Sequence, residues 1–123
     1  MIGLSSMEPN DTFLLKTIVG YCEDVLNAIE RFSLDEKVVT DDVDLRAILS
    51  FFVLQIGETA SKLSDTFKAS HPEIEWRAII GLRHRIVHAY GKVIPAILWD
   101  AATNDIPELR SYCINVLEHS KAA

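Results

Sequence analysis

Cysteine and long hydrophobic runs are both scarce in this sequence of 123 residues. Its two cysteines, Cys22 and Cys113, stand far apart within amphipathic stretches, so we expect buried free thiols and no secreted disulfide framework. The longest apolar run, residues 47–57, is interrupted by Ser50 and Gln55 and is too short to span a bilayer. The opening residues lack the basic start and apolar core of a signal peptide. We therefore expect a cytoplasmic protein without a membrane segment.

Strand signals are missing as well, and the apolar spacing is helical throughout. No alternating run is bounded by turn residues, and the five glycines and four prolines are scattered. Short connections predict an all-α, up-and-down bundle of about five helices in a single domain over residues 1–123, with residues 1–9 as a disordered extension. From apolar residues spaced three and four apart, the expected helices span about 10–32, 42–68, 73–89, 94–103 and 105–120.

Local signals predict where these helices start and how they pack. A capping-box pattern at residues 33–36 predicts one short turn, and a loop then ends in an N-cap at Thr40 or Asp41. Asp105 is expected to cap a restarted helix. Gly57 lies inside the second predicted helix, where glycine costs about 1 kcal/mol relative to alanine. We interpret it as a site of close approach by another backbone.

Carboxylates are absent from one window of an otherwise acidic chain. The formal net charge is −6, which predicts weak non-specific attraction to nucleic acid or anionic lipid. From Arg77 to Lys92, however, there are four basic residues and no Asp or Glu. The rest of the chain keeps eight of the 12 basic side chains against all 18 acidic ones. Such a contrast is typical of a local anion site, although four basic residues in a window also occur by chance.

Residues 83–90 read RHRIVHAY, with two arginines, two histidines and a tyrosine. On an ideal helix, which advances about 100° per residue, Arg83 and Tyr90 share one side, and His84 and His88 share a neighbouring side. Arg83 and His88 are then about 140° apart around the axis and about 7.5 Å apart along it. They do not form a tight pair in a straight helix. Either the helix frays or kinks at this end, or the groups converge with those of a second chain.

Arginine and histidine together can cleave RNA without a metal ion. The forked guanidinium suits phosphate, and imidazole titrates near neutral pH and can move a proton. RNA supplies its own nucleophile, the 2′-hydroxyl. A histidine that removes this proton, beside an arginine that stabilises the phosphorane, would leave a 2′,3′-cyclic phosphate. The sequence holds no nearby carboxylate cluster for magnesium, which favours this route over a two-metal one.

Other interpretations of the same residues stay open. His84 and His88 are four apart and could also bind zinc, although no third ligand is evident. Arg85 fits either a basic rim or a solvated face. Glu58 is either a paired buried carboxylate or a partner that orients Arg83 or a histidine.

The chain also resembles a known family. Arg83, His88 and Tyr90 match the Arg-x4-His-x-Tyr motif of HEPN-domain ribonucleases. More specifically, the chain resembles the HepT toxin family over roughly residues 45–109, more than half of its length. The similar blocks, in the family's order, are LQIGETASKLS (54–64), PEIEWRAIIGLRHRIVHAY (72–90) and LWDAATNDIPEL (98–109).

The resemblance implies an all-helical homodimer that needs no metal or other cofactor. Arg83 and His88 of two protomers would face one cleft where RNA is cut. In the related toxin–antitoxin pairs, a minimal nucleotidyltransferase encoded next door attaches AMP to the motif tyrosine, so Tyr90 is implied as the AMP acceptor. His84 stands where family members carry a polar residue, most often Asn. It would hydrogen-bond phosphate or act as a second acid or base, with Arg85 in a supporting role.

Two functions follow as hypotheses. The first is a metal-independent endoribonuclease toxin of a HEPN and minimal-nucleotidyltransferase system. The second is a non-catalytic helical partner of a nucleotidyltransferase, whose basic cleft binds nucleotide or RNA. A remote third hypothesis is a zinc-dependent hydrolase.

Overall fold

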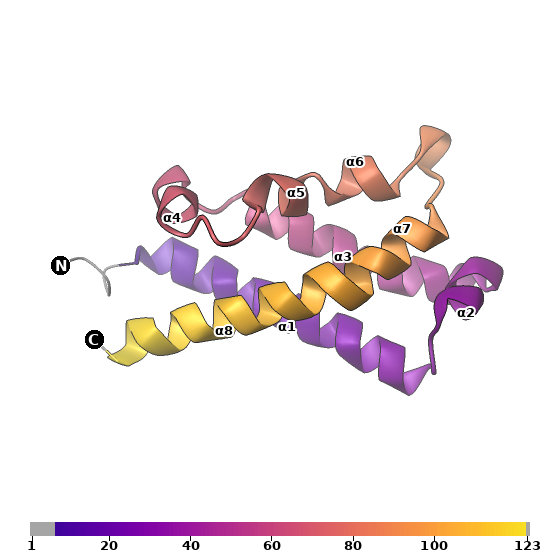
Figure 1. Cartoon of the computed structure of the whole chain (residues 1–123), viewed down its shortest axis with the longest axis horizontal. Helices are drawn as coiled ribbons and strands as arrows, with labels where there is room; N and C mark the ends of the chain where they lie inside the picture. The colour runs from indigo at the N-terminus through magenta and orange to yellow at the C-terminus, as the bar shows by residue number, and fades with distance from the viewer. Residues whose placement is uncertain (1–6, 123) are drawn as a thin grey trace.

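The structure, a computed structural model, describes residues 7–122 as helices joined by short connections (Figure 1). The predicted all-α class is confirmed, because that part of the chain contains no strand. The expected disordered extension, residues 1–9, lies mostly outside the described residues. The elements are α1 (Pro9–Arg31), α2 (Glu36–Asp41), α3 (Val43–Ala60), α4 (Asp65–Ser70), α5 (Trp76–Ile80), α6 (Leu82–Ile86), the 3-10 turn η1 (Ala89–Gly91), α7 (Pro95–Asp100), the π-helical turn η2 (Ala101–Asp105) and α8 (Ile106–Ala122).

The long segments run up and down through a bundle, as predicted (Figure 1). Helix α1 packs along α3 and along α8. The short helix α4 lies at the end of the bundle, α5 and α6 return along α3, and α7 continues through η2 into α8. Helix α1 begins and α8 ends at one end of the bundle, and the connection from α6 to α7 lies at the other. No helix in the described part is both long and apolar enough to cross a membrane.

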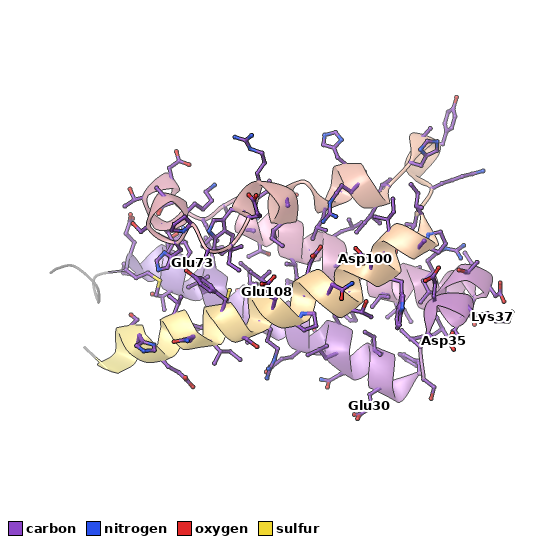
Figure 2. All side chains as sticks on the ribbon, viewed as in Figure 1. Glu30, Asp35, Lys37, Glu73, Asp100 and Glu108 are labelled. Carbon is purple, nitrogen blue, oxygen red and sulfur yellow. The ribbon has the colours of Figure 1, made fainter. Side chains whose placement is uncertain are left out.

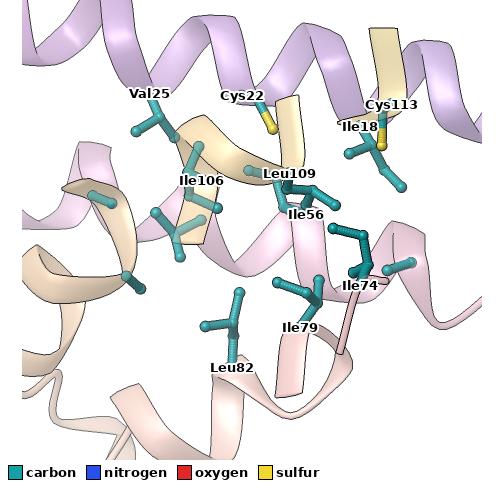
Figure 3. Close-up of a cluster of buried hydrophobic side chains, with 14 of the residues drawn as sticks. Ile18, Cys22, Val25, Ile56, Ile74, Ile79, Leu82, Ile106, Leu109 and Cys113 are labelled. Carbon is teal, nitrogen blue, oxygen red and sulfur yellow. The ribbon is translucent and has the colours of Figure 1, made fainter. Parts of the chain in front are cut away.

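One apolar core joins these segments (Figure 3). Ile18 of α1, Ile56 of α3 and Leu109 of α8 are at most 1% exposed. Burying a side chain of this size contributes about 1.5–3 kcal/mol. Cys22 and Cys113 lie in the same core as free, fully buried thiols, which confirms that expectation.

The predicted second helix over 42–68 is wrong, because the chain ends α3 and restarts as α4 within it. The buried carboxylate of Asp11, in α1, accepts hydrogen bonds from the Ser64 backbone nitrogen at 2.9 Å and from its hydroxyl at 2.7 Å. The Ser64 hydroxyl oxygen accepts in turn from the Phe67 nitrogen at 3.0 Å and caps α4. Asp11 and Ser64 are 53 residues apart in the sequence. Their contact therefore starts a new helix at a place where the local apolar spacing predicts an uninterrupted one.

The stretch before α3 also differs from the prediction, because α2 occupies most of the expected loop. Asp35 caps α2 and accepts a hydrogen bond from the Val38 nitrogen at 2.8 Å. The N-cap of α3 is Asp42, whose Oδ1 accepts from two first-turn nitrogens at 3.0 Å each. The expected N-cap at Thr40 or Asp41 is therefore wrong, since Asp35 caps α2 and Asp42, the residue after Asp41, caps α3.

The predicted restart at Asp105 is wrong too, because α7 passes through η2 into α8 without a break. Pro107 lacks a backbone N–H, and a proline ring clashes with the carbonyl four residues earlier in a regular helix. The wider π-helical turn η2 ends at Asp105, two residues before Pro107. Such turns and prolines are recognised causes of local helix distortion, and here the chain changes its hydrogen bonding at η2 and stays helical.

Gly57 marks the place where α5 and α6 lie closest to α3, which confirms the expected close approach. A Cβ added to Gly57 would lie 2.8 Å from the Ile79 carbonyl oxygen and 3.7 Å from the Leu82 Cβ. Any larger residue would push α5 away from α3. Because Gly57 has no side chain, α5 and the start of α6 can pack directly against α3.

Candidate active site

The basic motif begins on α6, which is anchored in the core and open to solvent on its other sides. Leu82 and Ile86 are both 0% exposed. Arg83, His84 and Arg85, between them, are exposed. Two buried residues four apart give the helix one apolar face and leave the intervening residues outside. A helix anchored in the core therefore presents Arg83, His84 and Arg85 to solvent.

The second half of the motif lies in a tight loop, so the predicted helix over 73–89 is wrong. Helix α6 ends at Ile86, and Val87 pairs with Val93 in an isolated antiparallel bridge. The Ile94 nitrogen donates a hydrogen bond to the Ile86 oxygen at 2.8 Å. β-Branched residues on both sides of the loop favour this extended pairing. Of the two alternatives, a helix that frays or kinks here or convergence with a second chain, the structure bears on the first, because the helix ends at Ile86, before His88.

Arg83 and His88 consequently stand on different supports. Arg83 is on α6, whereas His88 has extended backbone angles, φ −90° and ψ −175°. Both side chains are exposed. Within residues 7–122, the salt bridges and side-chain hydrogen bonds involve neither of them. Their donors are free to bind an anion from outside the chain.

Tyr90 occupies the tip of the loop. Its backbone is left-handed, with φ 62° and ψ 24°, and Gly91 follows with φ 77°. This conformation costs a residue with a side chain about 1–2 kcal/mol. The Tyr90 side chain is 103% exposed, so its hydroxyl is open to another molecule.

Arg85 belongs to a different surface from Arg83. Its Nη2 lies 3.2 Å from Asp105 Oδ2 in a salt bridge to η2. The two residues line a cleft of about 370 Å³ together with Glu73 and Glu108, which Figure 2 places before α5 and on α8. The positive charge of Arg85 is therefore offset by carboxylates. No local sequence pattern predicts this pair, because its members lie 20 residues apart.

A tyrosine hydroxyl is held at the same cleft. The Tyr112 hydroxyl donates a hydrogen bond to Glu73 Oε1 at 2.7 Å. Burial, followed by this bond, raises the pKa of Tyr112, and the same bond lowers the pKa of Glu73. At neutral pH the Tyr112 oxygen is thus already engaged and resists losing its proton.

Glu58 is exposed on α3, so its interpretation as a buried paired carboxylate is wrong. Gly57 takes the buried position under α5, and a helix turns the next residue about 100° away from it. In the described part of the chain no salt bridge joins Glu58 to Arg83. Within one protomer, Glu58 therefore does not orient the motif arginine through an ion pair.

The histidines do not gather into one cluster. His84 and His88 are no longer one helical turn apart, because α6 ends between them. His71 stacks on Phe67 with ring centroids 4.1 Å apart, and its backbone oxygen accepts from Trp76 Nε1 at 2.9 Å. No group of three or more His, Cys, Asp or Glu side chains among the described residues is placed to hold a metal ion.

The chain is similar to proteins named as ribonucleases over most of its length. A family model described as Ribonuclease HepT-like matches residues 20–116. A protein of Caldanaerobacter subterraneus subsp. tengcongensis, whose name marks it as a proposed RNase, is 30% identical over 107 residues, which are 87% of this chain and 94% of that protein. The probable ribonuclease HepT of Thermococcus cleftensis is 33% identical over 95 residues, 73% of this chain and 86% of its own length. No solved structure matches the chain. Because the family model matches residues 20–116, which include the motif and most of the helical bundle, the chain belongs to the HepT-like ribonuclease family.

Proposed function

We propose that this protein is a metal-independent endoribonuclease that uses Arg83 and His88. The observation that carries the proposal is that both side chains are exposed and unengaged within the described residues, on either side of the point where α6 ends. The Arg83 guanidinium is a permanent cation and the His88 imidazole can carry a proton. The sequence window around them, residues 77–92, contains no carboxylate that could compete for them. These are the two groups that transesterification of RNA requires.

The reaction can be written with these groups alone. The His88 imidazole takes the proton of the 2′-hydroxyl, and the 2′-oxygen forms a bond to the adjacent phosphorus. Arg83 donates hydrogen bonds to the non-bridging oxygens, whose charge grows in the phosphorane. The bond from phosphorus to the 5′-oxygen then breaks, and that oxygen receives a proton from His84 or from water. The products are a 2′,3′-cyclic phosphate and a 5′-hydroxyl.

The active form is a homodimer, and the outer face of α3 supports this. Val43, Ile48 and Phe51 on α3 and Phe13 on α1 are 63%, 38%, 56% and 65% exposed. Tyr21 of α1 meets Phe51 edge-on with ring centroids 6.5 Å apart, which joins the two helices into one surface. Exposed large apolar side chains spread along two neighbouring helices can form part of a protein interface. We call these five residues the α1–α3 face.

A second copy on the α1–α3 face would bring its own motif close to the first. Helix α6 packs on α3, the helix that carries most of this face. A two-fold axis that runs so as to keep both copies of α6 on one side of the dimer would bring the two motifs together. Arg83 of one chain and His88 of the other then line one cleft, which removes the need for both groups to converge within a single helix.

The proposed biological setting is a toxin–antitoxin pair, in which a minimal nucleotidyltransferase silences this chain at Tyr90. The Tyr90 oxygen would bond to the α-phosphorus of ATP, pyrophosphate would leave, and the phenolic proton would pass to a base of the partner. The complete exposure of Tyr90 supports this assignment. AMP two residues from His88 adds a bulky anion where RNA has to bind.

A nuclease assay in EDTA tests the proposal. Purified protein should cut single-stranded RNA and leave 2′,3′-cyclic phosphate ends. His88→Ala should lower the rate about 10²–10⁴-fold, the usual contribution of a general base, and Arg83→Ala about 10²–10³-fold. His119→Ala and Arg31→Ala are matched controls, because both residues are exposed and lie on α8 and α1, away from the motif.

The same assay separates the proposal from a non-catalytic function. If wild-type protein binds RNA or nucleotide and leaves RNA intact, the non-catalytic partner of a nucleotidyltransferase is the better description. Cleavage that is unchanged in both motif variants would point to a contaminating nuclease.

A further inference from the structure

The ring of Tyr90 is far more exposed than any other large apolar side chain in the described residues. It is 103% exposed, and the next value is 65%, for Phe13. It forms no aromatic pair within the described residues. A ring in this state contributes no burial to folding. A single exposed Phe or Tyr is ordinary, so exposure alone does not identify a binding site.

The backbone that carries this ring is both strained and fixed. Tyr90 holds φ 62°, a conformation that residues with a side chain rarely adopt. The Gly91 nitrogen donates to the His88 oxygen at 3.1 Å, and the Val87–Val93 bridge closes the loop behind it. Strained residues held by surrounding hydrogen bonds are concentrated at sites of function. The backbone under the ring is therefore held in place before a ligand binds, and only the side-chain torsions remain to be fixed.

The surroundings of the ring are cationic. Arg83 and Lys92 are exposed, and no salt bridge in the described part of the chain involves either of them. His88 is two residues before Tyr90, and Lys92 is two residues after it. Cations that follow a phosphate backbone, combined with an exposed aromatic ring, are the usual means of binding single-stranded nucleic acid. In RNA, a base can stack on such a ring only when it is unpaired.

We infer that the Tyr90 ring is a stacking platform for one unpaired base next to the phosphate held by Arg83 and His88. This inference rests on the proposed function and deepens it, because the ring gives a physical reason for single-stranded RNA, rather than duplex, as the substrate class. The ring and the hydroxyl of Tyr90 then have separable roles, since the ring holds the base and the hydroxyl accepts AMP. A modified Tyr90 cannot offer the same open face to RNA.

A binding experiment in the His88→Ala protein tests the inference without cleavage. The probe is a short single-stranded RNA carrying one 2-aminopurine, whose fluorescence is quenched by stacking. Tyr90→Phe keeps the ring, and Tyr90→Asn removes it while suiting the left-handed backbone. We expect Tyr90→Asn to weaken binding roughly 5- to 150-fold and to abolish the quench, because one stacked base is worth about 1–3 kcal/mol. Tyr90→Phe should restore both readouts, and a duplex of the same sequence should bind both variants alike.

Each result of this experiment decides the inference. Equal affinity and quench for the Phe and Asn variants overturns it, even if wild-type protein cleaves RNA in EDTA. A loss that affects duplex as strongly as single strand overturns the substrate class. If Tyr90→Asn leaves RNA binding intact and weakens only binding to the nucleotidyltransferase, the ring is a protein-docking element and the inference is wrong. Ring-dependent binding by a wild-type protein that does not cleave supports stacking and refutes the nuclease proposal alone.

Discussion

The Asp11 carboxylate holds both the backbone nitrogen and the hydroxyl of Ser64, at 2.9 and 2.7 Å, and so ties the first turn of α1 to the start of α4. In the Asp11→Ala variant, the backbone nitrogen and the hydroxyl of Ser64 lose their acceptor at a partly buried position. We expect the free energy of unfolding to fall by about 1.5–3 kcal/mol, the range for hydrogen bonds to a charged group. Urea denaturation measures it. Asp24→Ala, exposed on the same helix, should change it by less than about 0.5 kcal/mol; equal losses would contradict the assignment.

The two helical glycines Gly57 and Gly20 should respond to alanine with opposite signs. At Gly57 the new Cβ would meet the Ile79 carbonyl oxygen at 2.8 Å, so α5 has to move and stability should fall by about 1–3 kcal/mol. At Gly20 a Cβ meets nothing within 4 Å, so alanine should stabilise by about 0.5–1 kcal/mol. Thermal unfolding of the two variants checks this, and a loss at both positions would show that propensity and space do not explain the difference.

The buried thiols should make the protein lose stability in alkali. Burial raises the pKa of Cys22 and of Cys113 from 9.0 to about 12. The folded state therefore holds these protons more tightly than the unfolded chain does. Their contribution is complete below pH 9 and is lost as the pH rises toward about 12.

Denaturation at several pH values tests this against a variant with both cysteines changed to alanine. The variant should be less stable at neutral pH, because it leaves cavities, and should lose less stability above pH 9. Tyr112 is present in both proteins, so its own titration cancels in the comparison. Parallel pH curves would rule out the thiols as the cause.

Phe51→Asp should separate the proposed dimer by placing a charge in the α1–α3 face. The side chain is 56% exposed in the single chain, so the substitution leaves the monomer core intact. Light scattering should give about twice the monomer mass for wild-type protein and the monomer mass for the variant. Ser111→Asp, on an exposed position of α8, is the matched control and should remain dimeric. A monomeric wild type would contradict the dimer, and a dimeric variant would place its interface elsewhere.

Transfer of AMP should depend on Tyr90 alone among the tyrosines. With the cognate nucleotidyltransferase and ATP labelled at the α-phosphate, Tyr90→Phe should take up no label. Tyr112→Phe should be labelled normally, because its hydroxyl is bound to Glu73 and its pKa is raised. Tyr21→Phe should also be labelled. Label on the Tyr90→Phe protein would assign the acceptor to another residue.

The sequence predicts well those features that depend on neighbouring residues. The first helix was expected over 10–32 and spans Pro9–Arg31, because its apolar spacing is uninterrupted. Gly57 was interpreted as a close contact and is one, since a costly glycine inside a helix usually has a packing reason. The basic window around Arg83 was recognised from its missing carboxylates, whereas the pairing of Arg83 with His88 follows from the resemblance to the HEPN motif and stays a prediction.

Features that depend on distant residues were not predictable in this way. The cap at Ser64 needs Asp11, which is 53 positions away. The end of α6 at Ile86 depends on a bridge between Val87 and Val93, and the local pattern there still reads as helix. The partner of Arg85 is Asp105, which lies in the π-helical turn η2, and no local sequence pattern predicts that turn. Tertiary contacts decide each case, and they override local propensity.

The up-and-down path of the chain also decides how the protein can be handled. Helix α1 begins and α8 ends at one end of the bundle, and the loop that carries Tyr90 is at the other (Figure 1). Affinity tags, fluorophores or fusion partners attached at either terminus will therefore point away from the motif. A surface-immobilised sample, held by its tag, would present that loop to solution for binding measurements.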